Sequence, residues 1–194
     1  EVYLSAVTTT GRAPLAAAPP PRTFDLLEPG SAVPPLAFRD ESNQPRDLAG
    51  WRGRVVVVTF VYTRCPLPDF CPRMDRGFAE VQQGVLADQA LRDRVVLLSM
   101  SLDPEFDTPA VLMSHARQAG ADPRVWHFGT ASADEVERFA ARFGVSVFRE
   151  GSADMLTHNL RTAVIRPDGT LGDLLHGSDW TPASLLERVR RARG

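Results

Sequence analysis

The fold is decided by one stretch, Val55-Val-Val-Val-Thr-Phe-Val-Tyr62, and by the loop behind it, Thr63-Arg-Cys65-Pro-Leu-Pro-Asp-Phe-Cys71-Pro72. The first stretch is apolar without alternation, which is typical of a strand buried on both faces of a parallel sheet. The loop holds both cysteines of the chain. Behind it, apolar residues recur at helical spacing, namely Met74, Phe78, Val81 and Val85. The sequence therefore predicts a central strand that ends in a thiol pair at the start of a helix.

Further along the chain, strands and helices continue to alternate. Residues 95–100 predict a second buried strand. Thr108, followed by Pro109, predicts the start of a helix, because a threonine caps the free N–H groups and proline fits the first helical position. Ser132 and Glu135 have the spacing of a capping box and predict another helix start. This alternation favours parallel pairing with crossover helices.

The two ends of the domain differ from this pattern. Residues 145–148 predict a short strand, and two strands at 160–165 and 170–175 flank a tight turn, which is typical of a hairpin. Thr181 opens the last helix. Before the central strand, Val33 to Phe38 predict an edge strand because two prolines cannot join a sheet centre, and residues 43–51 indicate turns. The predicted fold class is α/β and thioredoxin-like, with a central mixed sheet flanked by helices and a C-terminal β-hairpin.

Composition separates an N-terminal segment from one domain. Residues 1–30 are rich in Ala and Pro and predict a tether or disordered segment, whereas residues 31–194 form the predicted domain. The chain begins at Glu1, so we expect a truncated or processed start, with a removed signal or anchor as one interpretation. No run reaches the roughly 20 apolar residues of a membrane helix. The net charge of −2, with arginine as the sole basic type, favours neither nucleic acid nor an anionic membrane.

The thiol pair indicates sulfur chemistry of one of three kinds. At a helix N-terminus the free N–H groups and the helix dipole favour a thiolate on Cys71, and a thiolate both attacks disulfides and binds soft metals. A purely structural disulfide between Cys65 and Cys71 is the third interpretation, although closing so short a loop adds little stability. The residues alone leave these interpretations open.

The other candidate ligands are weaker. His158 lies just before a predicted strand, and a lone histidine is more often structural than a ligand. We expect the same of the remaining histidines, His115, His127 and His176, and we expect Met74 in the core. Asp103 and Asp107 are expected to end a strand and to help open a helix, without a chemical role.

Four motifs in order add a resemblance. Tyr62-Thr-Arg-Cys65 with Cys71-Pro72 resembles the Tyr-Thr-x-Cys-x-x-x-Cys-Pro signature of the Sco (SenC-type) copper chaperones. Residues 101–109 are similar to that family's Ser-x-Asp-Pro-x-x-Asp-Thr-Pro segment, and residues 126–130 to its Trp-x-Phe stretch. His158 to Thr162, followed by Asp168-Gly169, resemble its histidine-bearing strand and hairpin. The resemblance covers roughly residues 33–190.

This resemblance implies a thioredoxin-like fold and copper, as Cu(I) or Cu(II), held by two cysteines and one histidine. Carried over, the ligands are Cys65, Cys71 and His158. The implied role is delivery of copper to, or reduction of, the binuclear copper centre of cytochrome c oxidase, so the implied partner is an oxidase subunit. The implied location is periplasmic or otherwise extracytoplasmic, and we expect a monomer. Two thiolates and an imidazole suit copper, and three donors leave the ion open to an acceptor's thiols.

The sequence departs from the family signature between the cysteines. Five residues, including Pro66 and Pro68, separate them where the family has three. We expect the loop to bulge, with its freedom limited by the prolines. The alternative to a copper chaperone is a thiol–disulfide oxidoreductase with Cys65 and Cys71 as its redox-active pair, for which His158 matters little.

Overall fold

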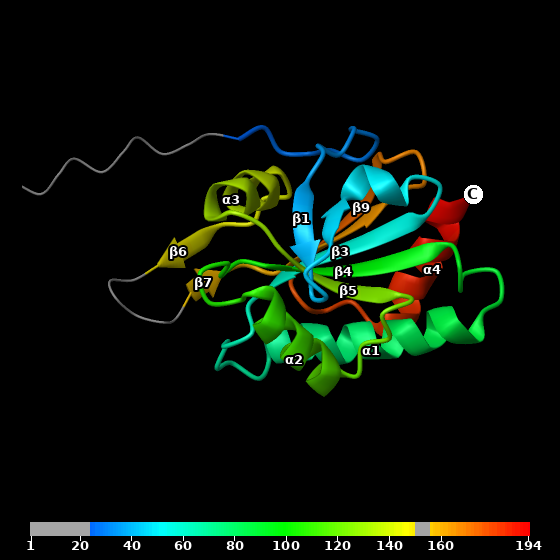
Figure 1. Cartoon of the computed structure of the whole chain (residues 1–194). Helices are drawn as coiled ribbons and strands as arrows, with labels where there is room; N and C mark the ends of the chain where they lie inside the picture. The colour runs from blue at the N-terminus through cyan, green and yellow to red at the C-terminus, as the bar shows by residue number, and fades with distance from the viewer. Residues whose placement is uncertain (1–23, 150–155) are drawn as a thin grey trace, which may run out of the picture.

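The computed structural model describes residues 24–149 and 156–194, which form a seven-stranded mixed sheet with helices on both faces and a small two-stranded sheet at one end (Figure 1). The strand order of the main sheet is β2-β1-β5-β4-β3-β8-β9. In chain order the elements are β1 (Ala37–Asp40), β2 (Pro45–Asp47), the 3-10 helix η1 (Leu48–Trp51), β3 (Val55–Val61), α1 (Cys71–Ala87), β4 (Val95–Ser101), α2 (Pro109–Ala119), β5 (Trp126–Thr130), α3 (Ala133–Arg142), β6 (Val147–Arg149), β7 (Leu156–His158), β8 (Arg161–Ile165), β9 (Leu171–His176) and α4 (Pro182–Arg193).

The predicted central strand is confirmed. Every residue of β3 is buried, and the strand pairs in parallel with β4 on one side and antiparallel with β8 on the other. β4 in turn pairs in parallel with β5, so helices α1 and α2 are the crossovers that parallel neighbours require. The thioredoxin-like α/β prediction is thereby confirmed, as is the hairpin of β8 and β9.

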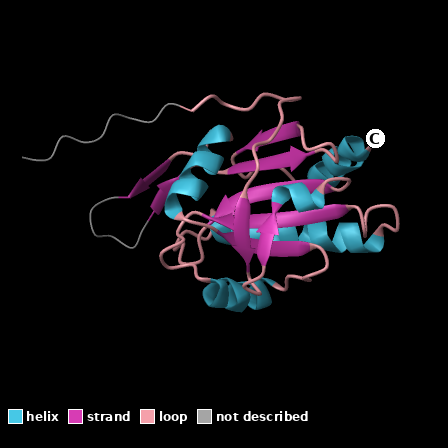
Figure 2. Cartoon of the chain, turned by 45° about the horizontal axis from the view of Figure 1, so that its top comes forward, coloured by secondary structure: helices cyan, strands magenta, loops and turns pink. Residues whose placement is uncertain are grey.

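Side chains of β3 alternate between two hydrophobic cores. Val55 and Val57 pack with residues of α1, α2 and α4 on one face. Val56, Val58 and Phe60 pack with α3 and with the segment before β1 on the other. Figure 2 shows helices on both sides of the strands, with the last helix near the C-terminal end. This double cover explains why the strand is apolar without alternation.

The predicted helix starts are confirmed by their caps. The Thr108 hydroxyl accepts a hydrogen bond from the Val111 N–H, at 3.4 Å, and α2 ends at Gly120 in the left-handed conformation. Ser132 and Glu135 form the predicted capping box at the start of α3.

Two predictions for the segment before β3 are wrong. The strand predicted at Val33 to Phe38 begins only at Ala37, and it is not an edge, because β1 pairs with β2 on one side and with β5 on the other. The prolines keep residues 34 and 35 out of the sheet. Residues 43–51, which were expected to be turns, contain the true edge strand β2 and the helix η1.

Two strands besides β2 escaped the sequence analysis, namely β5 and β7. β5 is fully buried but short, and its His127 and Gly129 interrupt the apolar pattern. Gly129 is required by packing, since a Cβ there would lie 2.8 Å from the ring of Phe38. β7 pairs with β6 in the two-stranded sheet, with Val147 opposite His158. Figure 1 shows this pair beyond the end of the main sheet, at the left.

Most of the predicted N-terminal tether, residues 1–30, lies outside the described residues. Of its last residues, Leu27 is buried and its N–H donates to the Arg142 carbonyl at 2.8 Å, while the Gly30 N–H donates to the Leu171 carbonyl at 2.7 Å. Among the helices that the structure describes, none has the length and apolarity needed to span a bilayer.

Candidate metal centre

The cysteine loop lies at the carboxyl end of β3. Its first turn is closed by a hydrogen bond from the Cys65 N–H to the Tyr62 carbonyl, at 3.3 Å, and its second by one from the Phe70 N–H to the Leu67 carbonyl, at 3.1 Å. The Arg76 side chain, from α1, also donates to the Pro68 carbonyl at 3.0 Å. The longer loop is thus folded into two turns, consistent with the predicted bulge.

The two cysteines differ in exposure. Cys71 opens α1, with Pro72 behind it, and is buried, whereas Cys65 is partly exposed, and both are free thiols. Burial raises the pKa of the Cys71 thiol, and contact with Cys65 raises it further. The sequence predicted a thiolate stabilised by the helix N-terminus, but burial outweighs that effect in this structure. Without a metal, Cys71 is therefore a protonated thiol at neutral pH.

His158 meets Cys71 although 87 residues separate them. The Nε2 atom of His158 lies 3.5 Å from the Cys71 sulfur. The other ring nitrogen, Nδ1, lies 3.1 Å from the Asn159 carbonyl, which fixes a proton on Nδ1 and leaves the Nε2 lone pair facing the sulfur. Burial lowers the pKa of His158, so the ring is neutral at neutral pH. A neutral imidazole with an anchored Nδ1–H is the form that binds metal ions.

Tyr62 joins the loop to the strand that carries the histidine. Its hydroxyl donates to the Leu156 carbonyl at 2.9 Å, and its ring lies edge-on to the ring of His158, with centroids 5.8 Å apart. Burial and a hydrogen bond with Cys65 raise the pKa of Tyr62, so this hydroxyl stays protonated as a donor. Tyr62, Cys65, Cys71 and His158 form one contiguous cluster, which we call the sulfur–imidazole cluster.

The side chains of the sulfur–imidazole cluster lie close together, but they do not yet surround a position for a metal ion. Within residues 24–149 and 156–194, no three side chains of the types His, Cys, Asp and Glu are already arranged to hold a metal ion. Cys71 and His158 are in contact, whereas Cys65 is the more exposed donor at the open side of the cluster. Three donors can therefore reach one ion only if their side chains adjust around it.

A buried carboxylate, missed by the sequence analysis, holds the two halves of the cluster together. Asp103 is fully buried and binds Arg64 of the cysteine loop, at 2.8 Å, and Arg149 of β6, at 3.3 Å. β6 is the partner of β7, which carries His158. The sequence predicts only that Asp103 ends a strand, because the burial of this side chain depends on contacts across the fold.

Asp107 also binds the cysteine loop. It does not cap helix α2, although the sequence predicted that it would help open this helix. Its carboxylate accepts from the N–H and the hydroxyl of Thr63 and from the Ser101 hydroxyl, with 3.2 Å from the Thr63 nitrogen to Oδ2. Burial raises the pKa of Asp107. The helix is capped by Thr108 instead.

The remaining candidates lie elsewhere. His115 pairs with Asp75 at 2.8 Å, and His127 pairs with the buried Glu41 at 3.3 Å, in agreement with their expected structural roles. His176 ends β9, and Met74 is buried in the core, both as predicted.

A thioredoxin-like sheet with a thiol and imidazole cluster at the carboxyl end of its central strand defines a class of α/β proteins with sulfur-based metal or redox sites. The family model of SCO1/SenC matches residues 26–193. The chain therefore belongs to the SCO1/SenC family, as its motifs had indicated.

Individual relatives are distant but similar over most of their length. The SCO1 protein homolog of Bacillus subtilis is 28% identical over 152 residues, which are 77% of this chain and 76% of that protein. The solved structure of BsSco, a member of the Sco family of cytochrome c oxidase assembly proteins, is 26% identical with a TM-score of 0.72, over 87% of this chain and 97% of that one. Copper-bound ScoI of Arabidopsis thaliana shares the fold, with a TM-score of 0.70 and 19% identity over 84% and 98% of the two chains.

Proposed function

We propose that this protein carries one copper ion between Cys65, Cys71 and His158 and passes it to a cytochrome c oxidase subunit while the binuclear copper centre of that enzyme is assembled. The observation that carries the proposal is the 3.5 Å contact between the Cys71 sulfur and His158 Nε2. It brings an imidazole from β7 to the thiol pair that follows β3. Membership of the SCO1/SenC family supports the same role.

The donor set suits a carrier of copper. Two thiolates and a neutral imidazole are soft and borderline ligands, which Cu(I) prefers and Cu(II) accepts. Three protein donors leave the ion open on one side, where Cys65 is partly exposed. A thiol of the acceptor can enter there and replace the donors one at a time, so the ion is never released into water.

The location is part of the proposal. We place the domain outside the cytoplasm, in the periplasm or an equivalent space, with the Ala- and Pro-rich residues before Leu27 as its tether, because Leu27 is already packed in the core. The binuclear copper centre is the proposed acceptor site, and a tether would keep the domain close to a membrane-bound oxidase.

Copper titration of the reduced protein tests the proposal. With Cu(I) delivered from a coloured competing chelator, we expect one ion per chain, and we expect Cys65→Ser and Cys71→Ser each to lose that ion. Met74→Leu is the matched control. Met74 has a soft sulfur donor and lies in α1 three residues after Cys71, but it is buried in the core, so its replacement should not affect copper binding. A wild-type protein that takes no copper from the chelator would refute the carrier role.

Binding should release protons, because Cys71 is protonated before the ion arrives. Its raised pKa means that each bound ion displaces at least the Cys71 proton, whereas the neutral His158 contributes none near pH 7. We expect the apparent affinity for Cu(I) to rise about tenfold or more per pH unit between roughly pH 6 and 8. Titration in weak buffer with a pH indicator measures the protons directly. An affinity independent of pH would contradict a thiol resting state.

The structure does not favour the oxidoreductase alternative. Exchange chemistry needs a stabilised thiolate, and burial raises rather than lowers the pKa of Cys71. His158, which is neutral, also supplies no positive charge that would lower the pKa of Cys71.

A further inference from the structure

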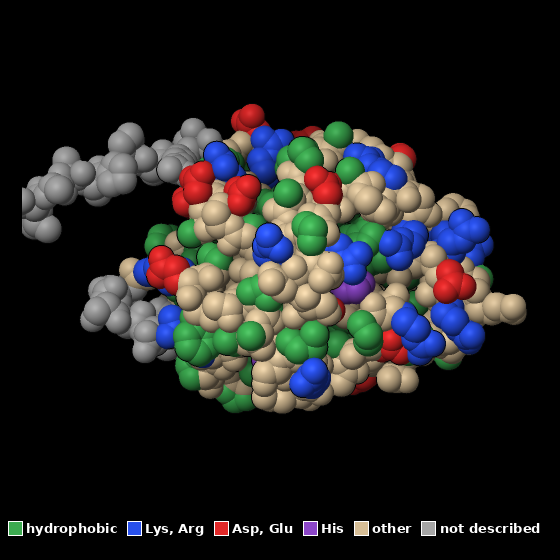
Figure 3. Space-filling view, viewed as in Figure 1, with side chains coloured by type: hydrophobic (Ala, Val, Ile, Leu, Met, Phe, Trp, Pro, Cys, Tyr) green, Lys and Arg blue, Asp and Glu red, His purple; other side chains and the backbone are tan. Residues whose placement is uncertain are grey.

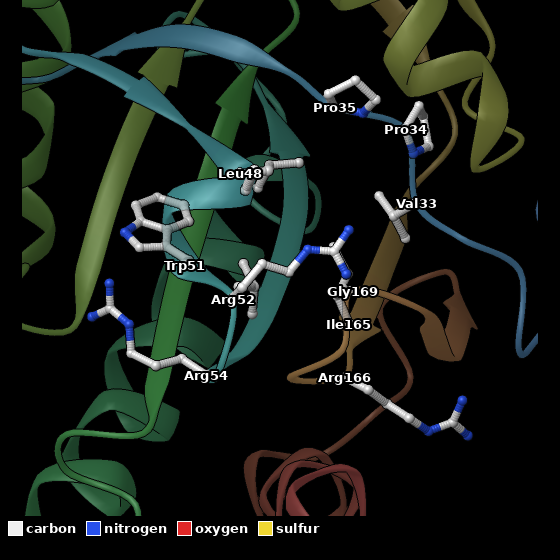
Figure 4. Close-up of a pocket in the computed structure, with 12 residues that line it drawn as sticks. Val33, Pro34, Pro35, Leu48, Trp51, Arg52, Arg54, Ile165, Arg166 and Gly169 are labelled. Atoms are coloured by element: carbon white, nitrogen blue, oxygen red, sulfur yellow. The ribbon is translucent and has the colours of Figure 1, made fainter.

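A second candidate site lies at the opposite end of β3 from the cysteine loop (Figure 4). It is a cavity of about 80 Å³ between the segment before β1, helix η1, the first residues of β3 and the hairpin of β8 and β9. Buried apolar side chains form its walls, among them Val33, Trp51, Val56 and Ile165. None of the residues that we place in the copper site lines it.

The walls are fixed by backbone hydrogen bonds between the segments. The Val33 N–H donates to the Gly169 carbonyl at 3.0 Å, and the Gly53 N–H donates to the Pro167 carbonyl at 2.9 Å. Leu48, at the start of η1, is tied to the Leu36 carbonyl at 3.1 Å. The cavity is therefore part of the folded domain and needs no rearrangement to exist.

One arginine, Arg52, lies at the mouth of this cavity. Arg52 reaches across it toward Gly169, while Arg54 and Arg166 extend to opposite sides (Figure 4). Gly169 has a φ of +78°, and an added Cβ there would overlap the Arg52 guanidinium, so the guanidinium lies directly on the glycine. Figure 3 shows further basic side chains on the same half of the molecule, at the right. Arg52 therefore places a positive charge at the mouth of an apolar interior.

Few acidic groups neutralise these arginines within the described residues. Arg166 donates to the Leu171 carbonyl, at 3.0 Å, and to the Thr170 hydroxyl, both of them neutral. Asp168 is the nearby carboxylate: its hydrogen bonds with Thr170 lower its pKa, and the charges of Arg166 and Arg52 lower it further. The carboxylate of Asp168, which lies near Arg52 and Arg166, is thus already engaged by Thr170.

We propose that this cavity binds a carboxylate carried on a short branched aliphatic group. The carboxylate pairs with the Arg52 guanidinium, whose planar donors match its two oxygens, and the aliphatic group enters between Trp51 and Ile165. An apolar cavity of 150 Å³ holds a benzene ring, so about 80 Å³ has room for only a few carbon atoms. Either a free short-chain acid or a C-terminal leucine of a polypeptide carries this chemistry. The proposal does not depend on copper binding.

Nuclear magnetic resonance of the full chain labelled with ¹⁵N tests the proposal. The ligands are 4-methylpentanoate, its neutral amide, and the acetylated tripeptide Ala-Ala-Leu with a free carboxyl terminus. We expect saturable shifts of the Trp51 indole and Gly169 amide signals with an acid, and binding at least tenfold weaker for the amide. Arg52→Gln should weaken binding of the acid at least tenfold, and Gly169→Ala should do the same by displacing Arg52. Arg124→Gln, which alters an exposed arginine paired with Asp122, is the control and should bind normally.

Each outcome of this experiment supports or overturns a stated part of the proposal. Binding of the tripeptide but not of the free acid would support the proposal and identify a polypeptide terminus as the source, and the reverse would identify a small metabolite. Equal affinity for acid and amide would overturn the carboxylate assignment. An unchanged affinity in Arg52→Gln, or no saturable shift of the Trp51 and Gly169 signals with either acid, would overturn the site.

Discussion

Replacing His158 with alanine is expected to weaken copper binding by roughly a hundredfold or more while the domain stays folded. Changes to residues that only support a metal ligand already cost about 10- to 100-fold, so loss of a ligand itself should cost at least as much. The Cys71 and Cys65 thiols would remain and could hold Cu(I) with two donors, but without the imidazole that lies 3.5 Å from Cys71. Competition with a chelator of known affinity measures the loss, and circular dichroism checks the fold.

His176→Ala is the matched control for this experiment. His176 is an exposed histidine at the end of β9 and lies outside the sulfur–imidazole cluster, so its removal should leave copper affinity unchanged. If His158→Ala bound copper as tightly as the wild type, the imidazole would not be a ligand. Two-cysteine chemistry alone would then have to explain any binding, and the oxidoreductase interpretation would regain support.

Asp103→Asn should lower both the stability of the domain and its affinity for copper. Asparagine keeps the shape of Asp103 but removes the charge that binds Arg64 and Arg149. Breaking a buried ion pair costs about 3–5 kcal/mol, but these two arginine side chains are 25% and 41% exposed, so we expect about 2–3 kcal/mol. For a domain of this size that corresponds to a Tm lower by roughly 5–10 °C.

The loss of copper affinity in Asp103→Asn distinguishes a positioning role from a merely structural one. Asp103 joins the cysteine loop to β6, so loss of its charge should make the distance between the thiols and His158 more variable. We therefore expect copper affinity to fall about tenfold. Asp122→Asn breaks a surface pair with Arg124 and should change neither quantity noticeably. A variant with a lower Tm but unaltered copper affinity would show that Asp103 only stabilises the fold.

The sequence predicted the parts of the fold that local patterns determine. The unbroken apolar run of β3 and the caps Thr108 and Ser132 each specify one element through short-range chemistry, and each was confirmed. β5 was missed because Gly129 interrupts its apolar pattern. A glycine is needed there because Phe38, which is far away in the chain, packs against this position. The position of β1 inside the sheet likewise depends on pairing that no local pattern reveals.

The candidate site was proposed from the resemblance more than from physical patterns in the sequence. Cys65 and Cys71 stand out in the sequence because they are the only cysteines, whereas His158 is one histidine among four. What joins it to the thiols is the β6 and β7 pair and the Asp103 bridge, which depend on contacts across the fold. The raised pKa of Cys71 could not be foreseen either, because burial is a property of the tertiary structure.

The placement of His158 on the small β6–β7 sheet, with both thiols on the main domain, has a consequence for the lifetime of the protein. A bound ion would add a further link between two structural units that Tyr62, Asp103 and the core packing of Leu156 already join. Any ligand that binds only the folded form raises resistance to heat and to proteases in proportion to its occupancy. Copper supply would then influence how long each molecule survives, because copper-free molecules would be degraded sooner than copper-bound ones.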